Sequence, residues 1–374
     1  MTLHILIKKE DLHPYLTSLQ NVAAKKGSMS ILGNVLIRTV DSGLELEATD
    51  LEIGIRHTVT ATILEPGCVT LPAKKLHEVI RVIDADDIEI KEQDNNWVKI
   101  TAGVSVYRMS GTACDEFPAF PSFEFDDSKE VNAKILEKMI SKVIFAVAHD
   151  KESIRTLTGI LLESGSDESD IFTKMVSSDG HRLSMFTSSE MSFSEQGNKK
   201  IIIPKKAGLE ILKICENNRI IFIKLDSKKM IVKSNNSILI VSLMEGDYPD
   251  YNRVFSIIDK NNKIKVDKNI LFNSLNKIIL FTDDLYNSIN LKIYNNKILL
   301  NSQNNEFGSA KDEINVEYSG DELNISYNCK YLIDILSNID GDKLNIYIKD
   351  DNSPAYIESL SDVGFESVIM PIRI

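Results

Sequence analysis

The sequence predicts an α+β fold made of three copies of one repeat, each with two helices laid across antiparallel sheets. Three observations predict it: similar segments recur along the 374 residues, paired helices keep their apolar residues in one register, and alternating strands lie between them. No repeat alternates strand and helix often enough for a doubly wound fold. The period is also too long for ordinary solenoids, whose repeats run about 20–50 residues.

Each predicted repeat opens with a short strand and then a helix. The apolar residues of this first helix are spaced by four and three, which places them on one helical face. The aligned residues are Leu12, Leu16 and Leu19; Leu136, Ile140 and Val143; and Leu271, Leu275 and Ile278. We expect this face to be buried in all three repeats.

A second helix follows further along each repeat. Pro72 and Pro204 suit its first turn, where the missing N–H is not needed. The residues that we expect to be buried in it are Leu76 and Ile80; Leu209 and Leu212; and Leu332 and Leu336. Strands then close each repeat before Pro118, Pro249 and Pro371. The predicted domains are therefore residues 1–125, 126–253 and 254–374.

Composition bounds the class of protein. No apolar run approaches the roughly 18 residues that span a bilayer, and the N-terminus lacks the basic region of a signal peptide. The four cysteines are scattered, so we expect buried, reduced thiols in a cytosolic protein and no metal site or cofactor. The net charge of −12, taken alone, argues against nucleic-acid binding.

The distribution of lysines points the other way. Lys134, Lys138 and Lys142 recur at i, i+4 and i+8 on the non-core face of one predicted helix. Further basic residues fall in or beside the corresponding helices: Lys74, Lys75, Arg81, Lys205, Lys206, Lys213, Lys268, Lys277 and Lys330. A solvated helix face is the simple explanation for any one helix. Six such helices instead favour a cationic lining that holds phosphates without reading sequence.

The C-terminal run from Val368 to Ile374 is apolar, broken only by Pro371 and Arg373. A final core strand explains Val368, but proline is confined to strand edges, so the strand fits less well beyond Pro371. The alternative is a tail that forms one wall of a groove, with residues 178–183 as the other wall. Asp179-Gly180 predicts a turn, and the corresponding places, 49–51 and 303–305, lack its Gly-His-Arg continuation.

Ser178, Asp179 and His181 are residue types that also serve in hydrolytic triads. Adjacency in sequence is poor evidence for a triad, and the six histidines show no metal-ligand spacing. We therefore expect no catalysis. A nuclease or hydrolase using Asp179 and His181 is the second interpretation, and a ligand-binding repeat module without a DNA role is the third.

Several short motifs, taken in order on the threefold repeat, are similar to those of a known family. They are Ile31-Leu32-Gly33-Asn34, Ala48-Thr49-Asp50-Leu51-Glu52, Ser178-Asp179-Gly180-His181-Arg182-Leu183, Tyr248-Pro249-Asp250-Tyr251, Tyr318-Ser319-Gly320 and Met370-Pro371-Ile372-Arg373-Ile374. Over its whole length the sequence resembles the bacterial sliding clamps, the β subunits of replicative DNA polymerase. The resemblance implies a head-to-tail homodimer that closes a six-domain ring, with helices lining the hole and sheets outside. It also implies a DNA polymerase processivity factor that encircles and slides along duplex DNA and has no chemistry of its own.

The resemblance further implies one partner-binding cleft per chain. Its walls would be Leu157, Ser178, Gly180, His181, Arg182, Leu183, Pro249, Arg253, Val254, Asn328, Tyr331, Val368, Met370, Pro371, Ile372 and Arg373. The apolar members suit a short peptide's leucine and aromatic anchors, and methionine adapts its shape to several ligands. Arg182, Arg253 and Arg373 are expected to hold backbone carbonyls or acidic flanks.

Other contacts and partners come from the charge pattern together with the same resemblance. The expected DNA contacts are Lys25, Lys26, Lys74, Lys134, Lys138, Lys142, Arg155 and Lys205. The expected dimer contacts join the 104–109 strand to the region of 278–280, through Val106, Tyr107, Arg108, Ile279 and Leu280. Expected protein partners are the catalytic subunit of the replicative polymerase, an ATP-dependent clamp loader and other clamp-motif proteins of replication and repair, all in the cytoplasm.

Overall fold

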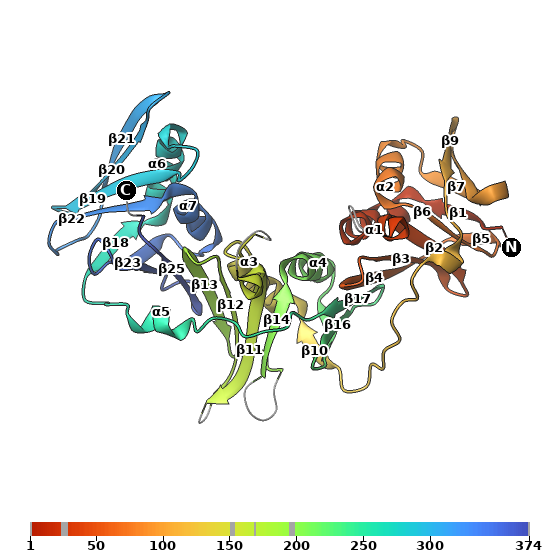
Figure 1. Cartoon of the computed structure of the whole chain (residues 1–374), viewed down its shortest axis with the longest axis horizontal. Helices are drawn as coiled ribbons and strands as arrows, with labels where there is room; N and C mark the ends of the chain where they lie inside the picture. Colours follow the sequence, from red (N-terminus) through yellow and green to blue (C-terminus); the bar gives the residue numbers. More distant parts are fainter. Residues whose placement is uncertain (1, 24–28, 150–153, 168–169, 194–198, 373–374) are drawn as a thin grey trace. The chain divides into compact units, whose positions relative to one another are not determined.

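The computed structural model describes residues 2–23, 29–149, 154–167, 170–193 and 199–372 (Figure 1). The chain divides into two compact units. Unit one combines residues 1–137 with 206–243, and unit two combines 138–205 with 244–374.

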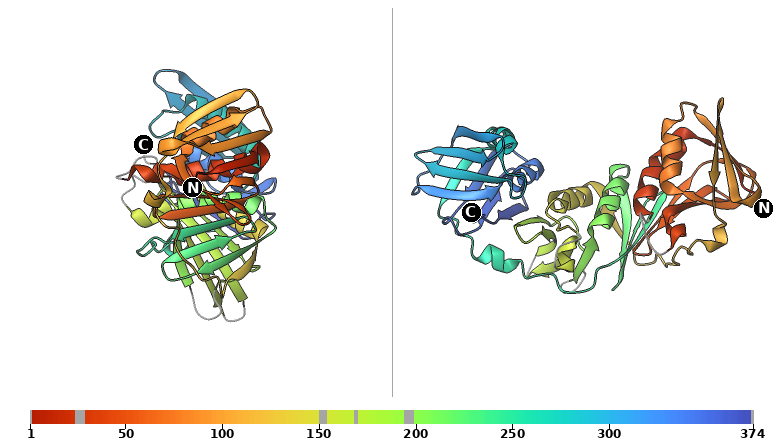
Figure 2. Two further views of the ribbon diagram at one scale, coloured as in Figure 1. Left: turned by 90° about the vertical axis from the view of Figure 1, so that its right-hand side faces the viewer. Right: turned by 45° about the horizontal axis from the view of Figure 1, so that its top comes forward.

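Unit one contains two antiparallel sheets. The five-stranded sheet runs β5 (Thr62–Glu65), β1 (His4–Lys8), β7 (Asp87–Glu92), β8 (Trp97–Ala102), β9 (Ser105–Ser110). The eight-stranded sheet runs β10 (Lys129–Asn132), β15 (Ile220–Leu225), β16 (Lys229–Lys233), β17 (Ser237–Ser242), β4 (Ile53–Val59), β3 (Gly43–Thr49), β2 (Asn34–Val40), β6 (Cys68–Pro72). Helices α1 (Lys9–Val22) and α2 (Ala73–Val82) pack side by side (Figure 2).

Unit two repeats this plan. Its eight-stranded sheet runs β14 (Lys199–Pro204), β11 (Gly159–Asp167), β12 (Asp170–Ser178), β13 (Arg182–Ser188), β25 (Phe365–Ile369), β24 (Ala355–Glu358), β23 (Lys343–Tyr347), β18 (Lys263–Asp267). The four-stranded sheet runs β21 (Gly308–Asn315), β20 (Lys297–Asn304), β19 (Ser288–Tyr294), β22 (Leu323–Asn328). Helices α6 (Lys268–Ile278) and α7 (Cys329–Asn338) pack together, and α5 (Asn252–Ser256) is a short turn of helix.

The predicted threefold repeat is confirmed by the order of the elements. Strand, helix, several strands, helix and three strands follow one another three times, beginning at β1, β10 and β18. The middle repeat supplies helices α3 (Ala133–Ile144) and α4 (Lys205–Glu216). Its strands are shared: four pair into the eight-stranded sheet of unit one and four into that of unit two.

Most of the predicted helix faces are buried as expected. The nine aligned residues of α1, α3 and α6 are all within the core, as are Leu76 and Ile80 of α2 and Leu332 and Leu336 of α7. The prediction for α4 is wrong, because Leu209 is 45% exposed and Leu212 is only partly buried. This helix has a second apolar row, Ala207, Ile211 and Ile214, spaced by four and three, and that row is buried instead.

Cysteine placement corrects another expectation. Cys215 and Cys329 are buried, but Cys68 and Cys114 are only partly so, and all four are free thiols.

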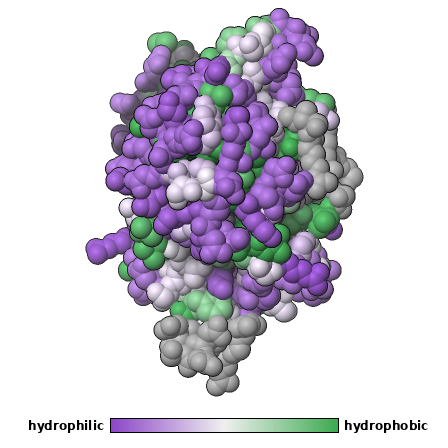
Figure 3. All heavy atoms as spheres, turned by 90° about the vertical axis from the view of Figure 1, so that its left-hand side faces the viewer, coloured by the Kyte–Doolittle hydropathy of each residue, from purple (hydrophilic) through white to green (hydrophobic). Residues whose placement is uncertain are grey.

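Within the described ranges, no group of three potential metal ligands is found and no helix is long and apolar enough to cross a membrane. The face drawn in Figure 3 is mostly hydrophilic, with apolar residues in several small groups.

Candidate functional site

The C-terminal tail connects the two sheets of unit two. Strand β25 ends at Ile369, as expected from Pro371. The Met370 N–H then donates to the His181 carbonyl at 2.8 Å, and the Ile372 N–H donates to the Ser326 carbonyl of β22 at 2.7 Å. The tail is thus held by main-chain hydrogen bonds while the Met370 side chain stays exposed.

The turn between β12 and β13 faces this tail. The Asp179 carboxylate accepts the N–H groups of His181 and Arg182, both at 3.0 Å, and Gly180 has a φ of 86°. The Ser178 hydroxyl donates to the Arg182 carbonyl at 2.7 Å. Glycine adopts a positive φ without steric cost, so the predicted turn is confirmed and rigidly held.

Arg182 is held by several contacts inside the protein. Its guanidinium is buried, with Nε 3.0 Å from Asp179, Nη1 2.6 Å from Asp334 and Nη2 donating to the Phe145 carbonyl at 2.8 Å. It also stacks over the Tyr331 ring, 4.2 Å from the centroid. One N–H from each of its three nitrogens is therefore engaged inside the protein. That Arg182 also holds partner carbonyls stays a prediction.

An aromatic residue of α7, Tyr331, packs against the 178–183 turn. The His181 ring stacks on the Tyr331 ring at a centroid distance of 6.3 Å. Asn328 caps the helix by accepting the Tyr331 N–H at 3.2 Å. His181 therefore presents one imidazole face against a fixed aromatic ring.

The floor beneath the tail is apolar. Leu183 pairs with Val368 across β13 and β25, and both belong to one buried cluster against which Val254 packs. Tyr251 anchors the connecting segment to this cluster by donating to the Glu163 carboxylate at 2.7 Å. Burial and this carboxylate raise the pKa of Tyr251, so its hydroxyl stays a donor at neutral pH.

Of the remaining predicted cleft residues, some are buried and others are exposed. Leu157 is buried at a 3₁₀ turn, whereas Pro249 is exposed. The side chain of Arg253 is 87% exposed and lies 3.3 Å from Asp250, so it remains accessible. Pro371 and Ile372 are partly buried, and Arg373 lies outside the described residues.

The predicted row of lysines on α3 runs from solvent into the interior. The exposed fractions of the side chains of Lys134, Lys138 and Lys142 are 66%, 44% and 7%. Lys142 pairs with the buried Asp362 and, at 3.0 Å, with Asp340, and donates to the Asn338 carbonyl at 2.6 Å. The prediction that Lys142 contacts DNA is wrong, since these carboxylates bury its ammonium.

The other predicted DNA contacts differ in accessibility. Lys74 and Arg155 are exposed, and Lys205 is partly buried and donates to the Val147 carbonyl at 3.3 Å. Lys25 and Lys26 lie outside the described residues. Several helix lysines bind nearby carboxylates, including Lys134 with Glu137 at 2.7 Å. Fewer accessible, unpaired ammonium groups therefore remain for the predicted cationic lining than the count of lysines suggested.

Each unit also presents one outer strand of a sheet. Strand β9 is an edge of the five-stranded sheet and carries the exposed Val106 and Arg108. Beside it on β8, Trp97 lies under the Arg108 guanidinium, 5.6 Å from the ring. In unit two, β21 is an edge, and Leu280 is exposed in the turn after α6. Open edges of this kind are prone to pair with another chain.

Comparison with known proteins accounts for the repeat. Sequence models of the DNA polymerase III beta subunit match three successive segments: the N-terminal domain over residues 3–121, the central domain over 130–250 and the C-terminal domain over 257–373. Together they span nearly the whole chain. The chain belongs to the bacterial sliding clamp family.

Known sliding clamps resemble it along their full length. The beta sliding clamp of Chlamydia pneumoniae is 28% identical over 369 residues, covering 99% of this chain and 98% of the relative. That of Haemophilus influenzae is 27% identical over 375 residues, covering 98% and 99%. The crystal structure of the DNA polymerase III beta subunit of Thermotoga maritima covers 100% of both chains at 26% identity and a TM-score of 0.88.

Sliding clamps are non-catalytic processivity factors of DNA polymerase III. The hydrolase interpretation of Asp179 and His181 is therefore wrong. The geometry agrees, because the Asp179 carboxylate is engaged by backbone N–H groups and Arg182, and the Ser178 hydroxyl donates to a carbonyl.

Sequence reasoning missed the residues that hold this clamp's candidate cleft in shape. Asp334 and the Phe145 carbonyl fix Arg182, and Glu163 fixes Tyr251. Only Asp334 gave a signal, since it lies three residues after Tyr331 on the same predicted helix face. The others are distant in sequence from the groups that they bind.

Proposed function

We propose that two copies of this clamp close head to tail into a ring around duplex DNA. Two exposed edges support this: β9 with Val106, Tyr107 and Arg108, and the region of β21 with Ile279 and Leu280. Different surfaces on one chain make a heterologous contact, which gives a ring when the rotation closes. The three matched segments support the proposed domains 1–125, 126–253 and 254–374.

The accessible cations are proposed to face the DNA phosphates. Lys74, Lys134, Lys138 and Arg155 are exposed in the described residues, and Lys205 is partly so. A few lysines, several of them shared with carboxylates, would contact the backbone without reading bases. Weak, salt-dependent contacts of this kind permit sliding. The site of action would be the cytoplasm.

The tail, the 178–183 turn and the apolar floor are proposed to bind short peptide motifs of other replication proteins. Candidate partners are the polymerase catalytic subunit, the clamp loader and repair proteins that carry the motif. The support is geometric: an exposed, adaptable Met370 lies beside the buried Leu183–Val368 pair, and Arg253 is accessible at the rim. Apolar sites with few placed polar groups suit such recognition.

Retention on circular DNA tests the ring. The chain should be loaded by a clamp loader and ATP onto a nicked circular plasmid and then followed by gel filtration. We expect it to co-elute with circles and to be lost after a restriction enzyme linearises them, because a ring slides off ends. Equal retention on circular and linear DNA would contradict topological linkage, and uncut plasmid treated with inactive restriction enzyme is the control.

A further inference from the structure

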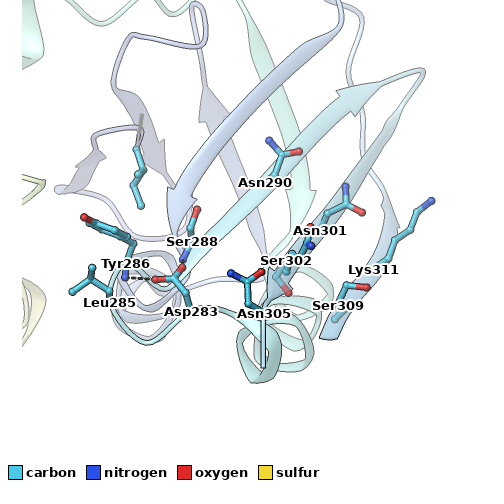
Figure 4. A pocket seen from close by; sticks show the side chains of 13 residues that line it. Asp283, Leu285, Tyr286, Ser288, Asn290, Asn301, Ser302, Asn305, Ser309 and Lys311 are labelled. Carbon is cyan, nitrogen blue, oxygen red and sulfur yellow. Dashed lines mark hydrogen bonds between the residues drawn. The ribbon is translucent and has the colours of Figure 1, made fainter. Parts of the chain in front are cut away.

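A hollow of about 1130 Å³ lies over one face of the four-stranded sheet in unit two (Figure 4). Strands β19, β20 and β21, the loop around residues 283–286 and the tail residue Ile372 line it. None of the cleft residues predicted from sequence lines it except Ile372. It is therefore a separate surface that meets the candidate cleft at the tail.

The sheet's alternation makes this face polar. Ile289, Leu291 and Ile293 of β19 are buried on the other face, so Ser288 and Asn290 point the opposite way. Asn290 is paired with Asn301, and Asn301 is paired with Lys311 on the next strand. Amide side chains and one lysine thus form a row across three strands.

This face has unused hydrogen-bonding capacity. The Ser288 hydroxyl is buried and has no hydrogen-bond partner within the part of the chain that the structure describes. Buried polar groups are rarely left unpaired, and a bound polar atom would satisfy it. The ammonium of Lys311 is exposed and makes no ion pair among the described residues, so it favours an acidic group on the ligand.

Two apolar side chains lie at the other end of the hollow. Leu285 and Tyr286 lie together there, opposite Lys311, and are 77% and 59% exposed (Figure 4). The Asp283 carboxylate holds their loop by accepting the Tyr286 N–H at 2.6 Å and the Ser288 N–H at 3.2 Å. These hydrogen bonds preorganise the loop, which reduces the entropy lost when a ligand binds.

The hollow continues from the tail of the candidate cleft. Ile372 is hydrogen-bonded to Ser326 of β22, and the Ser326 hydroxyl accepts the Asn290 amide at 3.2 Å. Met370 lies two residues earlier on the same tail. A chain that lies along residues 370–372 therefore reaches the polar sheet face without turning back.

We propose that this hollow, the flank subsite, binds residues adjacent to the motif of a cleft-bound partner. Its occupant is an extended segment with one apolar side chain for Leu285 and Tyr286, polar groups for Ser288 and Asn290, and a carboxylate for Lys311. The inference rests on the proposed peptide-binding function of the cleft and adds a second determinant of partner choice.

Fluorescence anisotropy with three labelled peptides tests the flank subsite on the full chain. One peptide carries only a glutamine-leucine-phenylalanine type motif. The other two add six residues containing leucine, serine and glutamate, either before or after the motif. We expect one flanked peptide to bind roughly five- to tenfold more tightly than the motif alone.

Variants separate the subsite from the cleft. Tyr286→Ala and Lys311→Glu should each remove most of that gain while leaving the affinity for the motif alone unchanged. Phe307→Ala is the matched control, because Phe307 is another exposed aromatic residue of the same domain that does not line the hollow, and the gain should persist.

Two other results would overturn the inference in distinguishable ways. Equal binding of all three peptides, or a gain that survives both variants, would remove the flank subsite and leave the cleft intact. Failure of the motif peptide to bind the unaltered chain would overturn the cleft itself, and the flank subsite with it.

Discussion

In both eight-stranded sheets a strand of the middle repeat pairs with a strand of another repeat. We call the β17–β4 pair the first join and the β13–β25 pair the second join. At the first join the Ser242 N–H donates to the Glu52 carbonyl, and at the second the Met370 N–H donates to the His181 carbonyl, both at 2.8 Å. The two joins share one backbone plan.

The turns at the joins also match. The Asp50 carboxylate accepts the N–H groups of the residues two and three positions later, as Asp179 does. The central residue has positive φ in both, 75° at Leu51 and 86° at Gly180. The turn is therefore a repeated structural device and does not itself distinguish the candidate cleft.

The joins differ in the side chains that they bury and in where the chain goes next. The first buries an imidazole, His57, whose ring nitrogens lie 2.7 Å from the Ser18 hydroxyl and 2.8 Å from that of Ser237. The second buries the cations Lys142 and Arg182 among carboxylates. After β17 the chain continues toward Tyr248, whereas after β25 it leaves a short tail. One backbone plan thus carries two different sets of buried side chains and two different chain continuations.

Removing the tail should produce the largest difference between the joins. Deleting residues 370–374 takes away Met370 and Ile372, so we expect binding of the motif peptide to be abolished in anisotropy titrations. Sedimentation should still show a dimer, because the proposed dimer contacts lie elsewhere. Dissociation into monomers would show that the tail has been misassigned, and retained peptide binding would contradict the cleft.

Removing the charge of Lys142 should destabilise the second join. Lys142→Ala leaves the buried carboxylate of Asp362 with Lys138, 3.2 Å away, as its cation, and we expect it to lower the free energy of unfolding by about 3 kcal/mol, the lower end for a broken buried ion pair. Urea unfolding of the full chain measures this. Lys134→Ala, on the same helix but exposed, should change it by less than about 0.5 kcal/mol. Equal losses in the two variants would contradict the buried ion pair.

Acid should weaken the first join. Burial, with a smaller contribution from the charge of Lys213, lowers the pKa of His57 to about 3. The unfolded chain takes up this proton near pH 6.5, so the stabilisation is complete above that pH and is lost as pH falls toward 3. We expect about 2 kcal/mol less stability from this group at pH 5 than at pH 7.5.

The measurement is urea unfolding as a function of pH. His57→Asn keeps a polar side chain without a titrating ring and should flatten the dependence between pH 7.5 and pH 5. An unchanged slope in that variant would assign the acid sensitivity to other groups.

Local periodicity explains what the sequence could predict. The buried faces of α1, α3 and α6 follow from spacings of four and three, and Pro371 ended the last strand as expected. In α4, two apolar rows had helical spacings, and only packing decided that the row containing Ile211 is buried and the one containing Leu209 is not.

Long-range partners explain what it could not predict. The same spacing that placed Lys134 outside also placed Lys142 in line with it, but Asp362, 220 residues away, buries the latter. The internal partners of Arg182 are also distant in sequence, since Asp334 lies 152 residues away and the Phe145 carbonyl 37. Such pairings join helices and turns that are far apart in the chain, and the periodicity within one element does not specify them.

Trp97 is the single indole in this chain, and it stands next to the open edge strand β9 beneath Arg108. Its intrinsic emission therefore comes from one place only. A partner that covers or exposes this strand edge would change the wavelength and intensity of Trp97 emission, so opening and closing of the proposed ring could be followed in real time without attaching a dye.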